Sequence, residues 1–364
     1  MTNAKKRIAW FDALRGLALL WIIFYHFTHD SGTSIVNIFN TAHLSFLGLV
    51  KIIGLTGEWG VNIFIVLSGA GLTFAAINRP LSIRTFFARH LKRLVIPYYL
   101  SLAVIVLALL IMALVRAGHF GTAFTTEFFQ GARLGNMPFA ITAAQIAGGL
   151  LILPRLFVVP LSSAWFVALI VQLYFVFPLL LRLMNKLGRR LFFLSCLLVS
   201  IGIQMLLIIY SNRWTWLPVP QANVFLRLAE FSLGMILGAG LAQLKINRRW
   251  LIVPTAIFLW LLGVAFFPVL REIPVIAATV LVFAAIPVAK VFAKFPGLTW
   301  IGRRSLEIFL IHDAVRFVYN SWPVANSWLT AWPAGFIIYL GLIIAVAYGF
   351  TKLVDRAMKQ RQVT

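Results

Sequence analysis

Acidic residues are scarce in this chain, which has nine aspartates and glutamates against 32 lysines and arginines in 364 residues. Charged residues of both signs make up 11% of the sequence, less than half of the roughly one quarter found in soluble domains. Cys196 is the single cysteine, so an intrachain disulfide is excluded and a metal cluster is not expected. These shortages exclude an ordinary soluble domain and a disulfide-stabilised secreted fold.

What the chain has in abundance is apolar sequence, with 62% hydrophobic residues and a mean hydropathy of +0.95. Apolar runs close to the length that crosses a bilayer recur along it. They predict an all-α, polytopic membrane helix bundle that forms one integral membrane domain over residues 1–364. Ten transmembrane helices are expected, near residues 9–28, 59–78, 94–115, 162–182, 191–210, 224–243, 250–268, 273–291, 303–320 and 334–353.

The distribution of lysine and arginine predicts how these helices are oriented. With the N-terminus in the cytoplasm, 23 of the basic residues lie in inner segments, six in outer segments and three within helices. The positive-inside rule therefore predicts that both termini are cytoplasmic. The net charge of +23 reports this topology and predicts attraction to anionic inner-leaflet lipid, not nucleic-acid binding. The long outer connection, residues 116–161, holds a short apolar stretch at 139–153 that is expected to be re-entrant or interfacial.

Two polar residues stand out in the first apolar run, Arg15 and His26. Their spacing of eleven residues makes three helical turns plus about 20°, so both side chains project from one helix face, about 16 Å apart. Ionisable residues inside a membrane helix are costly and indicate function by default. The alternative is that Arg15 snorkels to one interface while His26 lies in the opposite headgroup layer.

Further polar residues lie within or beside the predicted spans. Arg227 and Glu230 have the i, i+3 spacing of an ion pair, and His312 and Arg316 share a face at i, i+4. The set is completed by Glu58, Asn62 and Asp313. The predicted helix directions place the set from mid-membrane toward the outer side. Buried ion pairs can also serve only to fix helix register, so a structural role is the alternative for each.

Several blocks of sequence resemble the acyltransferase-3 family. Its first-helix pattern of Arg, ten residues, then His matches FDALRGLALLWIIFYHF (11–27). The other similar blocks, in the family's order, are GEWGVNIFIVLSGAGLTF (57–74), FFARHLKRLVIPYY (86–99), RLAEFSLGMILG (227–238) and WIGRRSLEIFLIHDAVR (300–316). Two departures stand out. His90 replaces the second of the family's paired arginines, and Ile170, Val171 and Gln172 stand where many members carry acidic residues.

The resemblance implies transfer of an acyl group, usually acetyl, from cytoplasmic acyl-CoA to a hydroxyl of an extracytoplasmic or lipid-linked glycan. His26 suits this reaction as a general base or as a nucleophilic acyl carrier, and the sequence leaves both roles open. Arg15 is expected to hold the donor or to neutralise charge in the transition state. An imidazole that acts as a base needs an orienting carboxylate, for which Glu58 is the first candidate and Asp30 the second.

The basic segment before the third predicted helix offers Arg89, Lys92 and Arg93 to the phosphates of acyl-CoA. Positive-inside topology alone would also demand such a segment. No metal is expected. The expected partners are acyl-CoA, a glycan or glycolipid acceptor and membrane lipid, in the plasma (inner) membrane of a bacterium. The identity of the acceptor, the acyl length and an oligomeric state such as a homodimer are left open.

A transporter or flippase of a glycan precursor, without group-transfer chemistry, is the alternative function. Intramembrane His, Asp and Arg also form proton relays. Against it, the two halves of the chain show none of the internal similarity common in transporters.

Overall fold

A computed structural model describes residues 8–30, 50, 53–54, 56–77, 82–117, 133–134, 137–138, 164–209, 223–241, 274–321 and 333–360. Over these residues the regular structure is helical apart from one short antiparallel pair, β1 (Arg133–Leu134) with β2 (Met137–Pro138). The all-α prediction is confirmed at this level. The predicted helix at 250–268 and the predicted re-entrant stretch at 139–153 lie outside the described residues.

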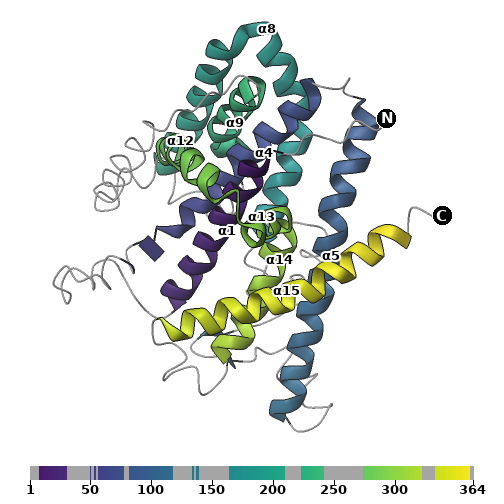
Figure 1. Cartoon of the computed structure of the whole chain (residues 1–364). Coiled ribbons are helices and arrows are strands. Elements are labelled where there is room, and N and C mark those ends of the chain that lie inside the picture. Colours follow the sequence, from purple (N-terminus) through teal and green to yellow (C-terminus); the bar gives the residue numbers. More distant parts are fainter. Residues whose placement is uncertain are drawn as a thin grey trace, which may run out of the picture. The chain divides into compact units, whose positions relative to one another are not determined.

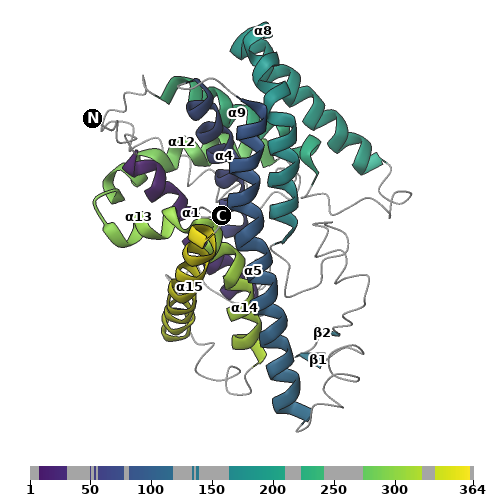
Figure 2. The same ribbon diagram turned by 90° about the vertical axis from the view of Figure 1, so that its right-hand side faces the viewer.

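The helices are labelled in Figure 1 and, after a quarter turn, in Figure 2. They are α1 (Ala9–Asp30), η1 (Gly57–Trp59), α4 (Gly60–Ile77), α5 (Ile83–Ala117), α8 (Ala164–Ile209), η5 (Val224–Arg227), α9 (Leu228–Gly240), α12 (Pro274–Phe292), α13 (Pro296–Arg303), α14 (Ser305–Ser321) and α15 (Ala334–Gln360). The chain divides into two units. Unit 1 comprises Met1–Leu81, Phe177–Ile209 and Phe225–Ser305, and unit 2 comprises Ser82–Val176, Tyr210–Val224 and Leu306–Thr364.

Among the described residues, five helical stretches are long and apolar enough to cross a membrane. They are Ala9–His29, Gly57–Ile77, Ile83–Ala108, Trp165–Leu207 and Ala334–Lys359. A shorter apolar stretch, Leu281–Phe292, lies in α12. The chain is therefore a multi-pass membrane protein, while the count of ten spans and the orientation of the termini stay predictions.

Two helices differ from the predicted boundaries. The predicted spans 162–182 and 191–210 belong to α8, which is broken at Gly188, where φ is 74° and ψ is 163°. Glycine adopts this positive φ without steric cost. The predicted start of the third helix at residue 94 is wrong, because α5 begins at Ile83. The first turns of α5 are amphipathic, with Phe86 buried and Arg89 exposed, so a search for wholly apolar runs misses them.

Glycines bring α4 and α9 together in unit 1. A Cβ on Gly234 would meet the main chain of Val66, and one on Gly238 would meet that of Ala70. From the other side, a Cβ on Gly69 would meet the carbonyl of Phe231. Small residues spaced four apart allow the backbones of membrane helices to approach this closely. The two helices lie side by side in both views (Figures 1 and 2).

The N-terminal half of α1 is held by the short helix α13 in the same way. A Cβ on Gly302 would meet the carbonyl of Asp12, and one on Gly16 would meet the carbonyl of Leu298. α1 also packs against α4 and α12 within unit 1. Backbone contact with α13 and packing against α4 and α12 thus fix the rotation of α1, which sets the direction in which its polar side chains project.

Aromatic contacts hold the described helices of unit 2. Phe166 of α8 lies edge-on to Phe309 of α14, with ring centroids 5.2 Å apart. Tyr319 of α14 lies 5.1 Å from Tyr339 of α15, and its hydroxyl donates to the carbonyl of Gly335 over 3.3 Å. These contacts fix α14 through side chains from two other helices.

We expect reporter fusions after residues 30, 86, 187 and 364 to report outside, inside, inside and inside, respectively. The reason is the 23-to-6 division of basic residues between inner and outer segments. Paired alkaline phosphatase and fluorescent protein fusions measure this, since the first is active outside the cytoplasm and the second inside. An extracytoplasmic signal at residue 364 would contradict the predicted topology.

Candidate active site

Helix α1 carries the first pair of predicted site residues. It runs without interruption from Ala9 to Asp30, which confirms that Arg15 and His26 project from one helical face. Both side chains are half-buried. Because both residues lie on the same helix, their separation along its axis is fixed at about 16 Å. Asp30 ends this helix, and its side chain lies outside the described residues.

The Arg15 guanidinium lies on the ring of Phe11, one turn earlier in α1, with its Cζ 4.8 Å from the ring centroid. A Cβ built on Gly71 of α4 would come within 3.6 Å of Arg15 Nη2 and 3.8 Å of the Phe11 ring. A cation over an aromatic face is stabilised by the ring quadrupole. The guanidinium therefore lies where α1 contacts α4, one turn toward the start of α1.

Glu58 lies in the turn η1, which is docked on α1. Trp21 Nε1 donates to the carbonyl of Ile53 over 2.7 Å, and a Cβ on Gly57 would meet the carbonyl of Trp21. The half-buried Glu58 follows Gly57 directly, so the turn brings it beside the stretch of α1 that leads to His26. Its role in orienting the imidazole stays a prediction.

A buried polar cluster joins α4 to η5 and α9. Arg227 Nη1 donates to Glu230 Oε1 over 3.0 Å and to Glu230 Oε2 over 3.3 Å. The same nitrogen donates to Asn62 Oδ1 over 3.2 Å. All three residues are buried, and the Glu230 side chain has no exposed surface. The predicted i, i+3 ion pair is confirmed, and the structure adds Asn62 from the second predicted helix to it.

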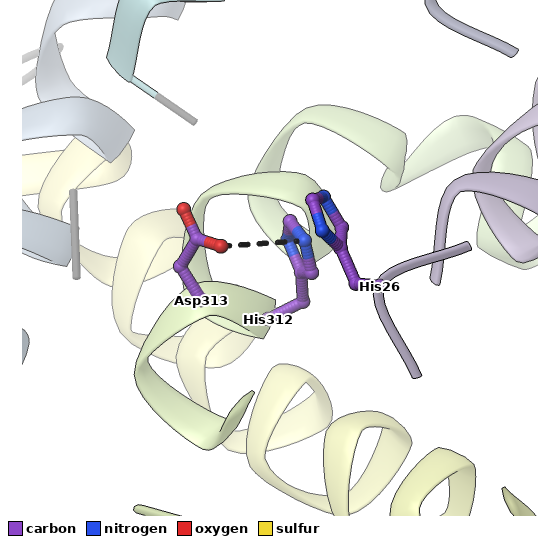
Figure 3. Close-up of side chains that lie close together, drawn as sticks. All are labelled: His26, His312 and Asp313. Atoms are coloured by element: carbon purple, nitrogen blue, oxygen red, sulfur yellow. Dashed lines mark ion pairs between the residues drawn. The ribbon is translucent and has the colours of Figure 1, made fainter. Parts of the chain in front are cut away.

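A second polar group lies on α14, within unit 2 (Figure 3). His312 Nε2 is 3.6 Å from Asp313 Oδ1, and Arg316 Nη1 is 3.7 Å from the same oxygen. His312 Nδ1 lies 2.5 Å from the carbonyl of Phe309. A carbonyl only accepts, so Nδ1 carries a proton and Nε2 faces the carboxylate. Asp313 and Arg316 thus form an ion pair across one helical turn.

The predicted donor-binding cations lie on the first turns of α5. Arg89 and Arg93 are exposed one turn apart, and Lys92 is half-buried beside them. His90 is turned away from this group, because its Nδ1 lies 2.8 Å from the carbonyl of Phe86. Its ring packs on Phe86, at 4.4 Å between centroids. The basic residues thus form a helical surface that could hold phosphates.

A family model, the acyltransferase domain of the acyltransferase-3 family, matches residues 8–352 of the chain. The chain belongs to this family. No curated protein and no solved structure matches it. Membership and the apolar helices together identify a membrane acyltransferase.

In this acyltransferase the structure shows what Gln172 and His90, two of the residues that depart from the family pattern, contact instead. Gln172 accepts a hydrogen bond from the backbone N–H of Val224 over 3.3 Å, a contact that an amide oxygen makes without a charge. The His90 ring lies 5.4 Å from that of Tyr174, so it packs among aromatic rings. At these two positions the chain therefore has a neutral amide and an imidazole that packs on aromatic rings.

Sequence reasoning missed the residues that surround the predicted ones. Phe11 precedes Arg15 by four positions, which is the one signal that could have indicated the ring beneath the guanidinium. The partners of Arg15 and Trp21 in other elements, Gly71 and Ile53, have no local signal, because their contacts join distant parts of the chain.

Proposed function

We propose that this acyltransferase transfers an acyl group, usually acetyl, from cytoplasmic acyl-CoA to a hydroxyl of an extracytoplasmic or lipid-linked glycan. The plasma (inner) membrane of a bacterium is its expected location. One observation carries the proposal: Arg15 and His26 project from one face of α1 in a chain that the family model covers from residue 8 to residue 352. A cation and a group that titrates near neutral pH are the two functions that acyl transfer to an alcohol requires.

His26 can act in either of two ways. As a general base, its imidazole takes the proton of the sugar hydroxyl while that oxygen attacks the thioester carbonyl. The carbon–sulfur bond then breaks, and the imidazolium returns the proton to the CoA thiolate. As a nucleophile, the imidazole first displaces CoA to form an acyl-imidazole, which the hydroxyl then cleaves. Glu58 suits an orienting role in both routes because it follows the glycine that docks η1 on α1.

The remaining polar residues are assigned to binding and support. Arg89, Lys92 and Arg93 attract the phosphates of acyl-CoA at the cytoplasmic side. Two polar clusters are proposed to support substrate binding: Asn62, Arg227 and Glu230, and His312, Asp313 and Arg316. No metal takes part in the proposed reaction.

The function is tested by transfer of a labelled acetyl group from acetyl-CoA by the purified full-length protein in lipid nanodiscs, with extracted envelope glycan as the acceptor. Mass spectrometry of envelope glycans from wild-type and deletion cells then identifies the acceptor by a missing 42-dalton acetyl mass. Transfer that requires the protein supports the proposal. Accumulation of an unmodified precursor inside deletion cells, with no transfer in vitro, would instead support the transporter function.

Arg15 should be required for use of the acyl donor, and lysine should not replace it. A guanidinium can hold two acceptor oxygens at once with its planar N–H groups, whereas an ammonium is a compact charge. The ring beneath Arg15 also favours a flat cation. We expect Arg15→Lys and Arg15→Ala to weaken acyl-CoA binding by at least about ten-fold, the loss of one charge-assisted hydrogen bond. Calorimetric titration with acetyl-CoA measures this.

Lys51, a basic residue outside the matched motifs, offers a control substitution, Lys51→Ala, that removes a positive charge elsewhere in the sequence. Wild-type donor affinity and transfer rate in Arg15→Lys would return Arg15 to the role of an interface anchor.

A further inference from the structure

The Leu-Ser-Gly-Ala-Gly segment of α4 presents its two glycines to different neighbours. Gly69 and Gly71 are two residues apart, which is about 200° around a helix, so they lie on opposite faces. Gly69 meets the main chain of Phe231 in α9, where a Cβ cannot fit. Gly71 instead meets α1, where the nearest atoms belong to the side chains of Arg15 and Phe11. Close packing against α9 therefore accounts for Gly69 but not for Gly71.

Gly71 forms one wall around the Arg15 guanidinium, and the Phe11 ring forms another. A Cβ at Gly71 would be 3.6 Å from Arg15 Nη2 and 3.8 Å from Cε1 and Cζ of Phe11. The guanidinium carbon lies 4.8 Å from the Phe11 ring centroid. A methyl group fits at these distances, but a longer side chain at residue 71 would occupy the space that the guanidinium and the ring now fill.

This arrangement favours one placement of a long side chain. An arginine near the end of a membrane helix tends to extend toward water, and its long stem allows many rotamers. The Phe11 ring, 4.8 Å from the guanidinium carbon, attracts the cation and so favours the rotamer that keeps it beside α4. A guanidinium held in one orientation binds two oxygens of a phosphate with better geometry than one that samples many.

We propose that Phe11 and Gly71 are positioning residues that hold the Arg15 guanidinium in the orientation that binds the acyl-CoA donor. This proposal rests on the proposed function, in which Arg15 contacts the donor. In this proposal neither residue touches the donor itself. Phe11 acts because its ring attracts the Arg15 cation. Gly71 acts because it has no side chain, which leaves space for the guanidinium beside α4.

The test compares donor binding and turnover in five variants of the full-length protein in nanodiscs. Phe11→Leu keeps an apolar side chain but removes the ring, and Phe11→Tyr restores a ring. Gly71→Ala adds the methyl group that fits, and Gly71→Leu adds the side chain that does not. Phe177→Leu is the matched control, because it removes a buried ring of unit 1 that packs on Phe231 of α9.

We expect Phe11→Leu to raise the dissociation constant of acetyl-CoA and its KM by up to about ten-fold, the loss of a half-buried cation–π contact, with kcat little changed. Phe11→Tyr and Gly71→Ala should bind as the wild type does. Gly71→Leu should match Arg15→Ala in donor affinity. Phe177→Leu should lower the melting temperature in detergent without changing the KM for acetyl-CoA.

Three outcomes would overturn the proposal, and they are distinguishable. If Arg15→Ala weakens donor binding while Phe11→Leu and Gly71→Leu do not, the positioning role is wrong and the donor role of Arg15 stands. If Arg15→Ala also leaves donor affinity unchanged, the donor role in the proposed function is wrong, and the positioning role is wrong with it. A uniform loss of affinity that includes Phe177→Leu would show general destabilisation instead of positioning.

Discussion

Replacement of His26 by alanine should lower acyl transfer by about 10²–10⁴-fold, the contribution of a positioned acid–base group, and should leave a folded protein. His26 is half-buried on the helical face that also carries Arg15, and it lies outside the glycine contacts that hold α1 to its neighbours. Loss of the imidazole therefore removes the proton acceptor without opening the helix packing. Labelled transfer per mole of folded protein and the melting temperature in detergent are the two measurements.

His29 provides the matched control for this experiment. It lies three residues further along α1 and is exposed, and its ring, like that of His26, lies near Tyr25. His29→Ala should retain transfer. A structural histidine at residue 26 would behave differently, since a lost buried polar contact costs about 1–3 kcal/mol of stability. A destabilised His26→Ala protein with normal activity per folded molecule would contradict the catalytic assignment.

His26→Ala also distinguishes the two proposed roles of His26, general base and acyl carrier. If His26 is the acyl carrier, wild-type protein incubated with labelled acetyl-CoA and no acceptor should release CoA once per site and hold the label on the chain. If His26 is a base, the protein itself is never labelled, and label reaches the acceptor only when protein, acetyl-CoA and acceptor are mixed. His26→Ala should therefore abolish labelling of the protein if His26 is the acyl carrier. If His26 is a base, neither the wild type nor His26→Ala should be labelled.

Local helical spacing accounts for the parts of the site that the sequence could predict. The shared face of Arg15 and His26 and the Arg227–Glu230 pair each lie within one helix or across one helix start, where 3.6 residues per turn determines what can meet. Similarly, runs of apolar residues were enough to predict α1, α4 and α15, because each is long and continuous.

Contacts between distant segments could not be predicted in this way. Asn62 joins the Arg227–Glu230 pair because α4 packs against α9, and Trp21 donates to Ile53 because the residues before η1 pack against α1. The early start of α5 was missed because its first turns are amphipathic, and an amphipathic helix has no long apolar run. Packing of small residues, such as Gly234 on Val66, determines these neighbours, and the sequence of one helix does not name its partner.

Breaking the Arg227–Glu230 pair on one side should destabilise the protein strongly. The two side chains are 9% and 0% exposed and 3.0 Å apart, so removing either partner leaves a buried charge without its counter-ion. Such single removals cost about 3–5 kcal/mol. We expect Arg227→Ala and Glu230→Ala each to lower the melting temperature in detergent, whereas Arg227→Met combined with Glu230→Leu should regain most of it, since no unpaired charge remains.

Arg316 supplies a comparison in which the remaining partner keeps a second contact. Its side chain is 18% exposed and its Nη1 lies 3.7 Å from Asp313 Oδ1, and His312 Nε2 lies 3.6 Å from the same oxygen, so Arg316→Ala should cost less stability than Arg227→Ala. Thermal unfolding of the single and double variants, with transfer measured on the folded fraction, distinguishes two roles for the buried cluster. A double variant that is stable and active would make the cluster structural. Single variants that fold normally but fail to transfer the acyl group would make Arg227 and Glu230 part of the reaction site, where the charges act on substrate rather than on each other.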